Sequence, residues 1–202
     1  NQLRLGDKTM WKFITLYFLI FPSLTFALET TPTSEQIEQA KNEGRIMAEV
    51  YRENVAMGIK VLTSFINRYE VGTGGICGGG HISTKLKNIV LSSYLEAKEG
   101  RELAEQAIKD ILKDEKVEVE ISACHKSPSQ AKDHVVLKQK GKVIEPQDIQ
   151  QTSKLAQSSM YFNTITAGFG LKALDPEEPC TLVLIPANGD KKEFEVDLAS
   201  MP

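Results

Sequence analysis

Apolar residues recur at helical spacing along the first third of the chain. After Thr33 they fall on one helical face as far as Tyr69. Thr33 and Gln36 have the spacing of a capping box, so we expect the helix to begin there. Gly44 and Gly58 lie on or beside the apolar face and predict a kink, a break or close packing against another helix. The pattern predicts one amphipathic helix of about nine turns.

A second helical pattern follows the glycine-rich stretch GTGGICGGGH at residues 72–81. Ser83 or Thr84 can cap this helix, and Gly100 can interrupt it before the apolar face resumes at Leu103. Two amphipathic helices joined by about a dozen residues suggest an antiparallel pair, or three or four helices if the glycines break them. On this interpretation the glycine-rich stretch is a joint between helices.

From residue 117 the apolar period changes from that of a helix to that of a strand. Residues 117–123, VEVEISA, alternate as a half-buried strand does, with Glu118 and Glu120 on the solvent side. Turns at Lys140-Gly141 and at Asn188-Gly189 predict two hairpins. Pro186 confines the strand before the second turn to a sheet edge or marks its end. Residues 148–162 are expected to form a third amphipathic helix.

These patterns predict an α+β protein. An N-terminal helical hairpin or small helical bundle is followed by a mainly antiparallel β region with one intervening helix. We expect three regions, with boundaries at residues 1–27 for upstream residues and a signal peptide, 28–116 for the helical region, and 117–202 for the β-rich region.

Residues 10–27, MWKFITLYFLIFPSLTFA, have the form of a secretory signal peptide that begins at Met10. Lys12 precedes an apolar run, and Thr25 and Ala27 occupy the two positions that a signal peptidase reads before a cut after Ala27. The run is shorter than the roughly 20 residues that span a bilayer, so we expect no membrane insertion after cleavage. We therefore expect a periplasmic or secreted protein, in a compartment where cysteines tend to pair.

The charge balance narrows the choice of partner. Without residues 1–27 the chain carries 21 basic and 26 acidic side chains. Binding to a phosphate backbone relies on a basic surplus, which this chain lacks. The same acidity argues against adhesion to an anionic membrane. We therefore expect no nucleic acid as a partner. The sequence contains no cofactor-binding motif that we can assign, so we expect no cofactor.

Three cysteines lie outside the predicted signal peptide: Cys77, Cys124 and Cys180. In an exported protein the simplest arrangement is one intramolecular disulfide with one thiol left over. Cys77 can pair with Cys124, which closes a loop of about 48 residues. Cys180 can instead be the partner of Cys124. A Cys180 left unpaired within the chain also offers a route to a disulfide-linked dimer.

Metal, thiol and phosphate chemistry are the alternatives to a simple joint at the glycine-rich stretch. A zinc site would need Cys77, His81, Cys124 and His125, yet neighbouring residues rarely aim at one ion. A thiol nucleophile at Cys77 would need His81, His125 or His134 as its base, and a glycine-rich loop holds a nucleophile poorly. A phosphate cradle needs a strand before the loop and a Lys-Ser/Thr pair after it.

We therefore assign no catalytic residue and no metal ligand. Four residues of the stretch are kept as binding-loop candidates: Gly78, Gly79, Gly80 and His81. Glu118 and Glu120 are interpreted as a solvated strand face, because nothing in the sequence indicates a pocket that would make them an acid–base pair.

Residues 76–112, ICGGGHISTKLKNIVLSSYLEAKEGRELAEQAIKDIL, follow a helix that contains AEVYRENVAMGIKVL. Together with the signal peptide, residues 35–124 resemble Tai-type periplasmic immunity proteins, the partners of type VI secretion amidases. The shared features are an Ile-Cys pair before the helix start at Ile82-Ser83-Thr84, a helix ending in Tyr94-Leu95, and an alanine-bearing helix. The chain departs from the family at Gly78–Gly80, where the family usually has a proline-containing segment.

The resemblance implies a disulfide between Cys77 and Cys124 and a helical part that docks a protein partner. We therefore expect an exported, non-enzymatic protein-binding protein of immunity-like function. One alternative is a structural component of an envelope or secretion assembly, with Cys180 linking subunits. A second alternative is a thiol- or zinc-dependent envelope hydrolase that uses Cys77.

Overall fold

The computed structural model describes residues 31–72, 77–126, 132–155, 160–187, 190–199 and 201. The predicted signal peptide and the Asn188-Gly189 turn lie outside these residues. The helices of the described chain are α2 (Ser34–Glu53), α3 (Val55–Asn67), α4 (Lys85–Lys98), α5 (Glu105–Lys113) and a 3-10 helix (Leu171–Ala173). The strands are β1 (Glu70–Val71), β2 (Gly80–Ser83), β3 (Lys116–His125), β4 (His134–Gln139), β5 (Lys142–Ile144), β6 (Asp148–Leu155), β7 (Tyr161–Gly170), β8 (Cys180–Ile185) and β9 (Lys192–Val196).

The first predicted helix is two helices in the structure, and the break is at Asn54. Thr33 and Gln36 form the expected capping box at the start of α2. At Asn54 the backbone is extended, with φ −150°, and the side chain accepts a hydrogen bond from Met57 N at 3.0 Å. Asparagine is a strong helix N-cap, so this residue ends α2 and begins α3. The break therefore falls at neither Gly44 nor Gly58.

Gly44 has a packing role in the middle of α2. A Cβ atom at this position would lie 2.8 Å from both Ser93 Cβ and Tyr94 N of α4. The absence of a side chain lets α2 and α4 approach closely, which was one of the three expectations for this glycine. The next helix begins at one of its two expected caps, because Thr84 accepts a hydrogen bond from Lys87 N at the start of α4. After α4, Gly100 interrupts the helical pattern with φ +78°.

The strands form two sheets, and all pairings between described strands are antiparallel. The five-stranded sheet has the order β1-β2-β3-β7-β6, and the four-stranded sheet has the order β5-β4-β8-β9. The strand predicted at 117–123 is β3, with Val117, Val119 and Ile121 buried. Both predicted hairpins are present, as β4–β5 and β8–β9, and Pro186 directly follows β8. The mixed α and β class with antiparallel sheets is thus confirmed.

The sequence prediction was wrong for one segment of the β part. In the segment predicted as a helix, residues 148–155 form β6 and residues 161–162 begin β7, while residues 156–159 lie outside the described residues. Residues 148–155 are a strand because they pair with β7 along their whole length, and this tertiary pairing overrides the local helical pattern. The glycine-rich stretch lies between α3 and α4, as expected of a joint between helices, and the structure adds two short strands there: β1 precedes the stretch, and β2 begins within it.

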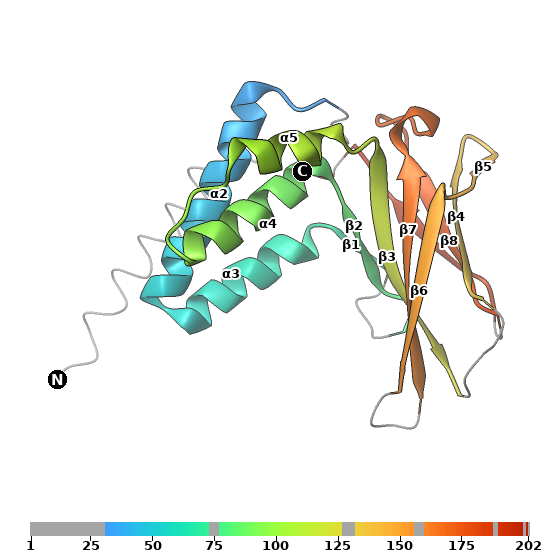
Figure 1. Ribbon diagram of the computed structural model, residues 1–202. Coiled ribbons are helices and arrows are strands. Elements are labelled where there is room, and N and C mark those ends of the chain that lie inside the picture. The colour runs from blue at the N-terminus through green and yellow to red at the C-terminus, as the bar shows by residue number, and fades with distance from the viewer. Residues whose placement is uncertain are drawn as a thin grey trace.

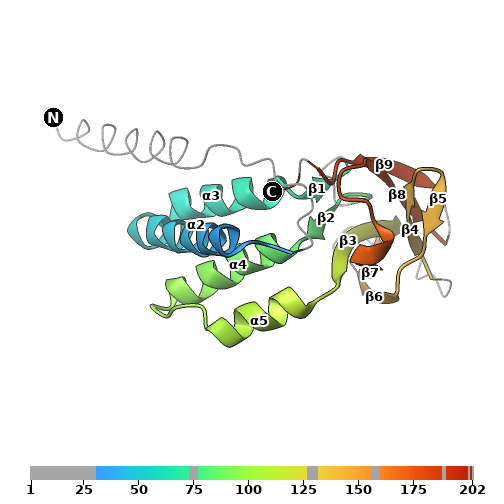
Figure 2. The same ribbon diagram turned by 90° about the horizontal axis from the view of Figure 1, so that it is seen from above.

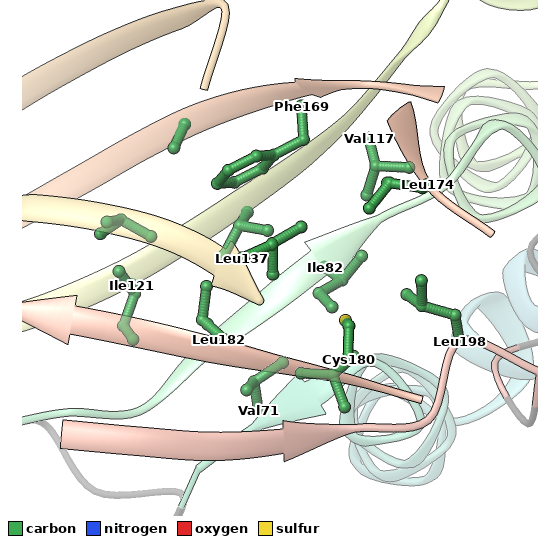
Figure 3. Close-up of a cluster of buried hydrophobic side chains, with 14 of the residues drawn as sticks. Val71, Ile82, Val117, Ile121, Leu137, Phe169, Leu174, Cys180, Leu182 and Leu198 are labelled. Carbon is green, nitrogen blue, oxygen red and sulfur yellow. The ribbon is translucent and has the colours of Figure 1, made fainter. Parts of the chain in front are cut away.

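The two sheets pack face to face over one apolar core. Figure 3 shows side chains of the five-stranded sheet, such as Ile121 and Phe169, gathered with Leu137 and Leu182 of the four-stranded sheet. A second, separate cluster of buried apolar side chains lies among the helices and includes Met47, Phe65 and Ile89. In Figures 1 and 2 the helices lie on one side of the five-stranded sheet, and the four-stranded sheet lies on the other.

Candidate binding site

A disulfide bond fixes the glycine-rich segment to the sheet. Cys77 and Cys124 are joined, with their Cα atoms 5.3 Å apart. The disulfide implied by the resemblance is therefore present. Of the two possible partners of Cys124, which were Cys77 and Cys180, the structure pairs it with Cys77. Cys180, the remaining cysteine, is buried. Such a bond is typical of proteins that fold in an oxidising compartment.

Backbone hydrogen bonds hold the segment after Cys77 against β3. Gly78 N donates to Ser122 O at 2.6 Å, and Ser122 N donates to Gly79 O at 3.1 Å. Gly78 has φ +90°, a conformation that glycine adopts without strain. At Gly80 a Cβ atom would lie 2.7 Å from Ile121 Cα, so only glycine lets β2 approach β3 this closely. The glycines give this segment a defined shape.

The segment borders a small pocket at the edge of the five-stranded sheet. The pocket has a volume of about 180 Å³ and is lined by Ile66, Glu70, Gly79, Gly80, His81, Glu120 and Ser122. His81 is the cross-strand neighbour of both Glu70 on β1 and Glu120 on β3. Three of the four candidate binding-loop residues therefore line the pocket, and the fourth, Gly78, lies next to it in the chain. Glu120, interpreted from the sequence as solvated only, belongs to the pocket as well.

A buried lysine shapes the electrostatics behind this pocket. Lys87 of α4 is 2% exposed, and its Nζ donates to Ile82 O at 2.8 Å and lies 5.0 Å from the centre of the Tyr69 ring. Burial lowers the pKa of Lys87 to about 8. Burial and the charge of Lys87 also lower the pKa of His81, against the opposing effect of Glu120 and Glu70. The His81 imidazole is thus neutral near pH 7, between two carboxylates.

An apolar stripe on α3 leads to the pocket. Val55, Ile59, Leu62 and Ile66 follow one another at helical spacing, so they share one face of α3. Val55 and Ile59 are each 52% exposed, Leu62 is half-buried, and Ile66 forms a wall of the pocket. Figure 1 shows α3 at the margin of the helices, running toward β1. We call Val55, Ile59, Leu62 and Ile66 the α3 stripe.

Away from the pocket, a cluster of buried polar side chains surrounds Asp133 at the C-terminal end of β3. The carboxylate of Asp133 accepts hydrogen bonds from His125 Nε2 at 2.9 Å, from Asn163 Nδ2 at 2.8 Å and from Ala187 N at 2.8 Å. The side chains of His125 and Asp133 are 2% and 0% exposed. Burial alone would raise the pKa of Asp133, but the three hydrogen bonds outweigh it and hold the pKa below its usual range. This cluster ties the ends of the two sheets together.

The structure gives no support to a thiol nucleophile at Cys77 or to a zinc site that includes it. Cys77 Sγ is bonded to Cys124 and is therefore not a thiolate nucleophile here. His125 points away from Cys124 because neighbouring strand residues face opposite sides of a sheet. Within the described ranges, no three His, Cys, Asp or Glu side chains group so that they could hold a metal ion. Burial raises the pKa of the Cys180 thiol to about 11.

Two functional features were not identified from the sequence. The α3 stripe was hidden in the expectation of one long helix with a single buried face, although the apolar excess of VAMGIKVLTSFI was visible. The cluster around Asp133 had no local signal, because its members come from segments far apart in the chain. None of the described helices is both long and apolar enough to cross a membrane. Comparison with protein-family models found no match, and comparison with curated protein sequences found none either.

Proposed function

We propose that this chain is an exported, non-enzymatic protein-binding protein, with an immunity-like role toward an envelope partner. The observation that carries the proposal is the α3 stripe, an exposed apolar helix face that ends at a pocket with polar walls. Exposed apolar patches rimmed by polar groups are typical of protein-interaction sites. The disulfide, the signal-like residues 10–27 and the resemblance to Tai-type proteins support the export and the immunity-like role.

The arrangement suits docking because the surface is held rigidly. α3 is capped by Asn54, and the segment beyond it is fixed by the disulfide and by the hydrogen bonds to Ser122. A rigid surface loses little conformational entropy on binding. The apolar stripe would supply the buried centre of the interface, and Glu70 and Glu120 would supply its polar rim.

Of the alternatives, neither receives comparable support. A hydrolase that uses Cys77 would require the disulfide to open before each reaction. An assembly component cross-linked through Cys180 would require β8 to leave the core, since Cys180 is 3% exposed.

Site-specific photo-crosslinking in the native cells tests the proposal. A photoreactive residue at Ile59 should capture one envelope protein, and the same residue at the exposed Lys109 of α5 serves as the matched control. With the captured protein purified, Ile59→Asp should weaken binding at least about tenfold without changing the fold. Equal capture from both positions, or unchanged affinity of the Ile59→Asp variant, would contradict the proposal. Export is tested separately by N-terminal sequencing of the mature protein, which should begin at Leu28.

A further inference from the structure

Among the described residues the two sheets have four edge strands, and three of these are either very short or charged. β1 has two residues and β5 has three. β9 carries charges at Lys192, Glu193 and Glu195 along its five residues. Very short edges and charged edges are the usual means by which proteins prevent strand pairing between molecules.

The fourth edge strand, β6, carries little of this protection. It has eight residues, lacks proline, and pairs with β7 without interruption from Asp148↔Gly168 to Leu155↔Tyr161. Residues 149–153 are all uncharged. Among the described residues no strand pairs with its other side, and Figure 2 shows it at the outer end of its sheet. In an antiparallel edge strand, alternate residues direct their N–H and C=O groups outward, so β6 offers a ladder of free hydrogen-bonding groups.

Two exposed apolar side chains mark the ends of this open edge. Ile149 is 38% exposed and Leu155 is 64% exposed. They are six residues apart in one strand, so both lie on the same face of the sheet. Their midpoint is Thr152, which is itself exposed.

We propose that a second copy of this chain pairs with β6 in antiparallel fashion, about a two-fold axis at Thr152. In this register Ile149 of each copy lies opposite Leu155 of the other, Gln151 opposite Ser153, and Gln150 opposite Lys154. Thr152 lies opposite its own counterpart. The two copies would form one continuous sheet across the dimer, a self-complementary interface of the kind that two-fold symmetry requires.

The β6 sequence favours a second copy over an unlike strand, because in this register each residue from 149 to 155 lies opposite a residue of compatible polarity and charge. The apolar residues meet apolar residues, the polar residues meet polar residues, and no like charges are opposed. Asp148 stays outside the ladder and keeps its ion pair with Lys116. The proposal does not depend on the proposed docking through α3, which lies on another part of the molecule.

Sedimentation velocity of the full chain at up to about 100 µM tests the dimer. Thr152→Lys places two like charges opposite each other, so it should raise the dimer dissociation constant at least about tenfold. Thr152→Glu should do the same, and an equimolar mixture of the two variants should restore dimers as a mixed pair. Val143→Glu, on the short edge strand β5 and 56% exposed, is the control that should leave the dimer unchanged.

A disulfide trap checks the register. In the proposed pairing the two Thr152 Cβ atoms lie about 5 Å apart, so Thr152→Cys should form an intermolecular disulfide on oxidation while Val143→Cys should not. A wild-type chain that remains monomeric throughout the concentration range would overturn the proposal, as would a dimer that survives Thr152→Lys. Strand pairing with an unlike partner would appear as a monomeric chain whose partner complex is lost in Thr152→Lys, and it too would overturn self-pairing.

Discussion

Helices α2 to α5 form a helical layer, and the two sheets packed face to face form a β-sandwich. Each of these regions buries an apolar cluster, but the two regions expose apolar side chains in different ways. The sandwich exposes Ile149 and Leu155 on an edge strand, where backbone pairing can cover them. The helical layer exposes Val55 and Ile59 on a helix face, where only side-chain packing can cover them. The two regions are therefore suited to different kinds of contact, strand addition on one and helix-face docking on the other.

The two regions also differ in how they treat buried polar groups. At the end of the sandwich, Asp133 is surrounded by hydrogen-bond donors. At the junction between helices and sheet, Lys87 is equally buried but has one carbonyl acceptor and one aromatic ring as neighbours. The Asp133 carboxylate is thus well supplied with donors, although Nδ1 of the buried His125 has no hydrogen-bond partner among the described residues, whereas the Lys87 ammonium has a single acceptor and retains an electrostatic cost.

The disulfide is the strongest single link between the glycine-rich segment beside the helices and the sandwich. Cys77→Ser with Cys124→Ser should lower the free energy of unfolding by about 4 kcal/mol, because the bond closes a loop with a sequence separation of 47 residues. Urea unfolding followed by circular dichroism measures the loss. Reduction should destabilise the wild type by the same amount and leave the double variant unchanged. A loss below about 1 kcal/mol would show that hydrogen bonds alone hold the segment.

The polar end of the sandwich should give the next largest effect. Asp133→Ala leaves His125, Asn163 and the Ala187 amide without their shared acceptor, so we expect a loss of about 3 kcal/mol in urea unfolding. The chain offers a matched control in the exposed pair His134–Glu145, which has the same 2.9 Å separation. Glu145→Ala should cost less than about 1 kcal/mol. Equal losses for the two variants would show that the buried Asp133 carboxylate contributes no more to stability than the exposed Glu145 carboxylate does.

Whether an element of the fold could be predicted from the sequence depends on whether the residues that determine it lie close together in the chain. Thr33, Thr84 and the alternation around Val119 act within a few residues, and the structure confirms the elements that they predict. The Asn54 break was also readable, since asparagine is a strong N-cap, but the continuous apolar face concealed it. β6 is different, because it pairs along its whole length with β7, and this pairing leaves no pattern within β6 itself.

The candidate site was partly predictable for the same reason. The cysteines and glycines identified the segment that borders the pocket. The row of Glu70, His81 and Glu120 depends on the register of three strands, which no spacing in the sequence reveals. The Asp133 cluster likewise unites distant residues, since Asp133 and Ala187 are 54 positions apart.

Close packing inside the helical layer is the third point of comparison with the sandwich. Gly44→Ala would place a Cβ atom 2.8 Å from Ser93 Cβ and Tyr94 N, so α2 and α4 must separate. We expect a net loss of about 2 kcal/mol, although alanine is otherwise the better helix former. Glu49→Ala, at an exposed position of the same helix, is the control and should change the stability by less than about 0.5 kcal/mol. Thermal unfolding measures both, and a stabilised Gly44→Ala variant would mean that the helices pack loosely.

Lys87 should give the smallest effect, one that appears only as a dependence on pH. Its pKa is about 8 in the folded protein and near 10.5 in the unfolded chain, so between these values the unfolded state binds more protons. The buried Cys180 opposes this effect in part, because its thiol has a pKa near 9 in the unfolded chain and about 11 in the folded protein. Stability should therefore rise with pH by a net amount of about 1 kcal/mol from pH 7.5 to pH 9.5. The window ends there because burial raises the pKa of Tyr69 above its usual value, and ionisation of tyrosine in the unfolded chain opposes the rise at higher pH.

Lys87→Met keeps the length of the side chain and removes the charge, so this alkaline rise should disappear in urea unfolding measured across the same range. Lys109→Met, at an exposed position of α5, is the matched control and should keep it. If the wild type and Lys87→Met show the same dependence on pH, Lys87 stays charged in the folded protein and its burial carries no electrostatic cost. If the rise is present and Lys87→Met abolishes it, burial of the Lys87 ammonium at the junction carries an electrostatic cost that the Asp133 carboxylate avoids through its hydrogen bonds.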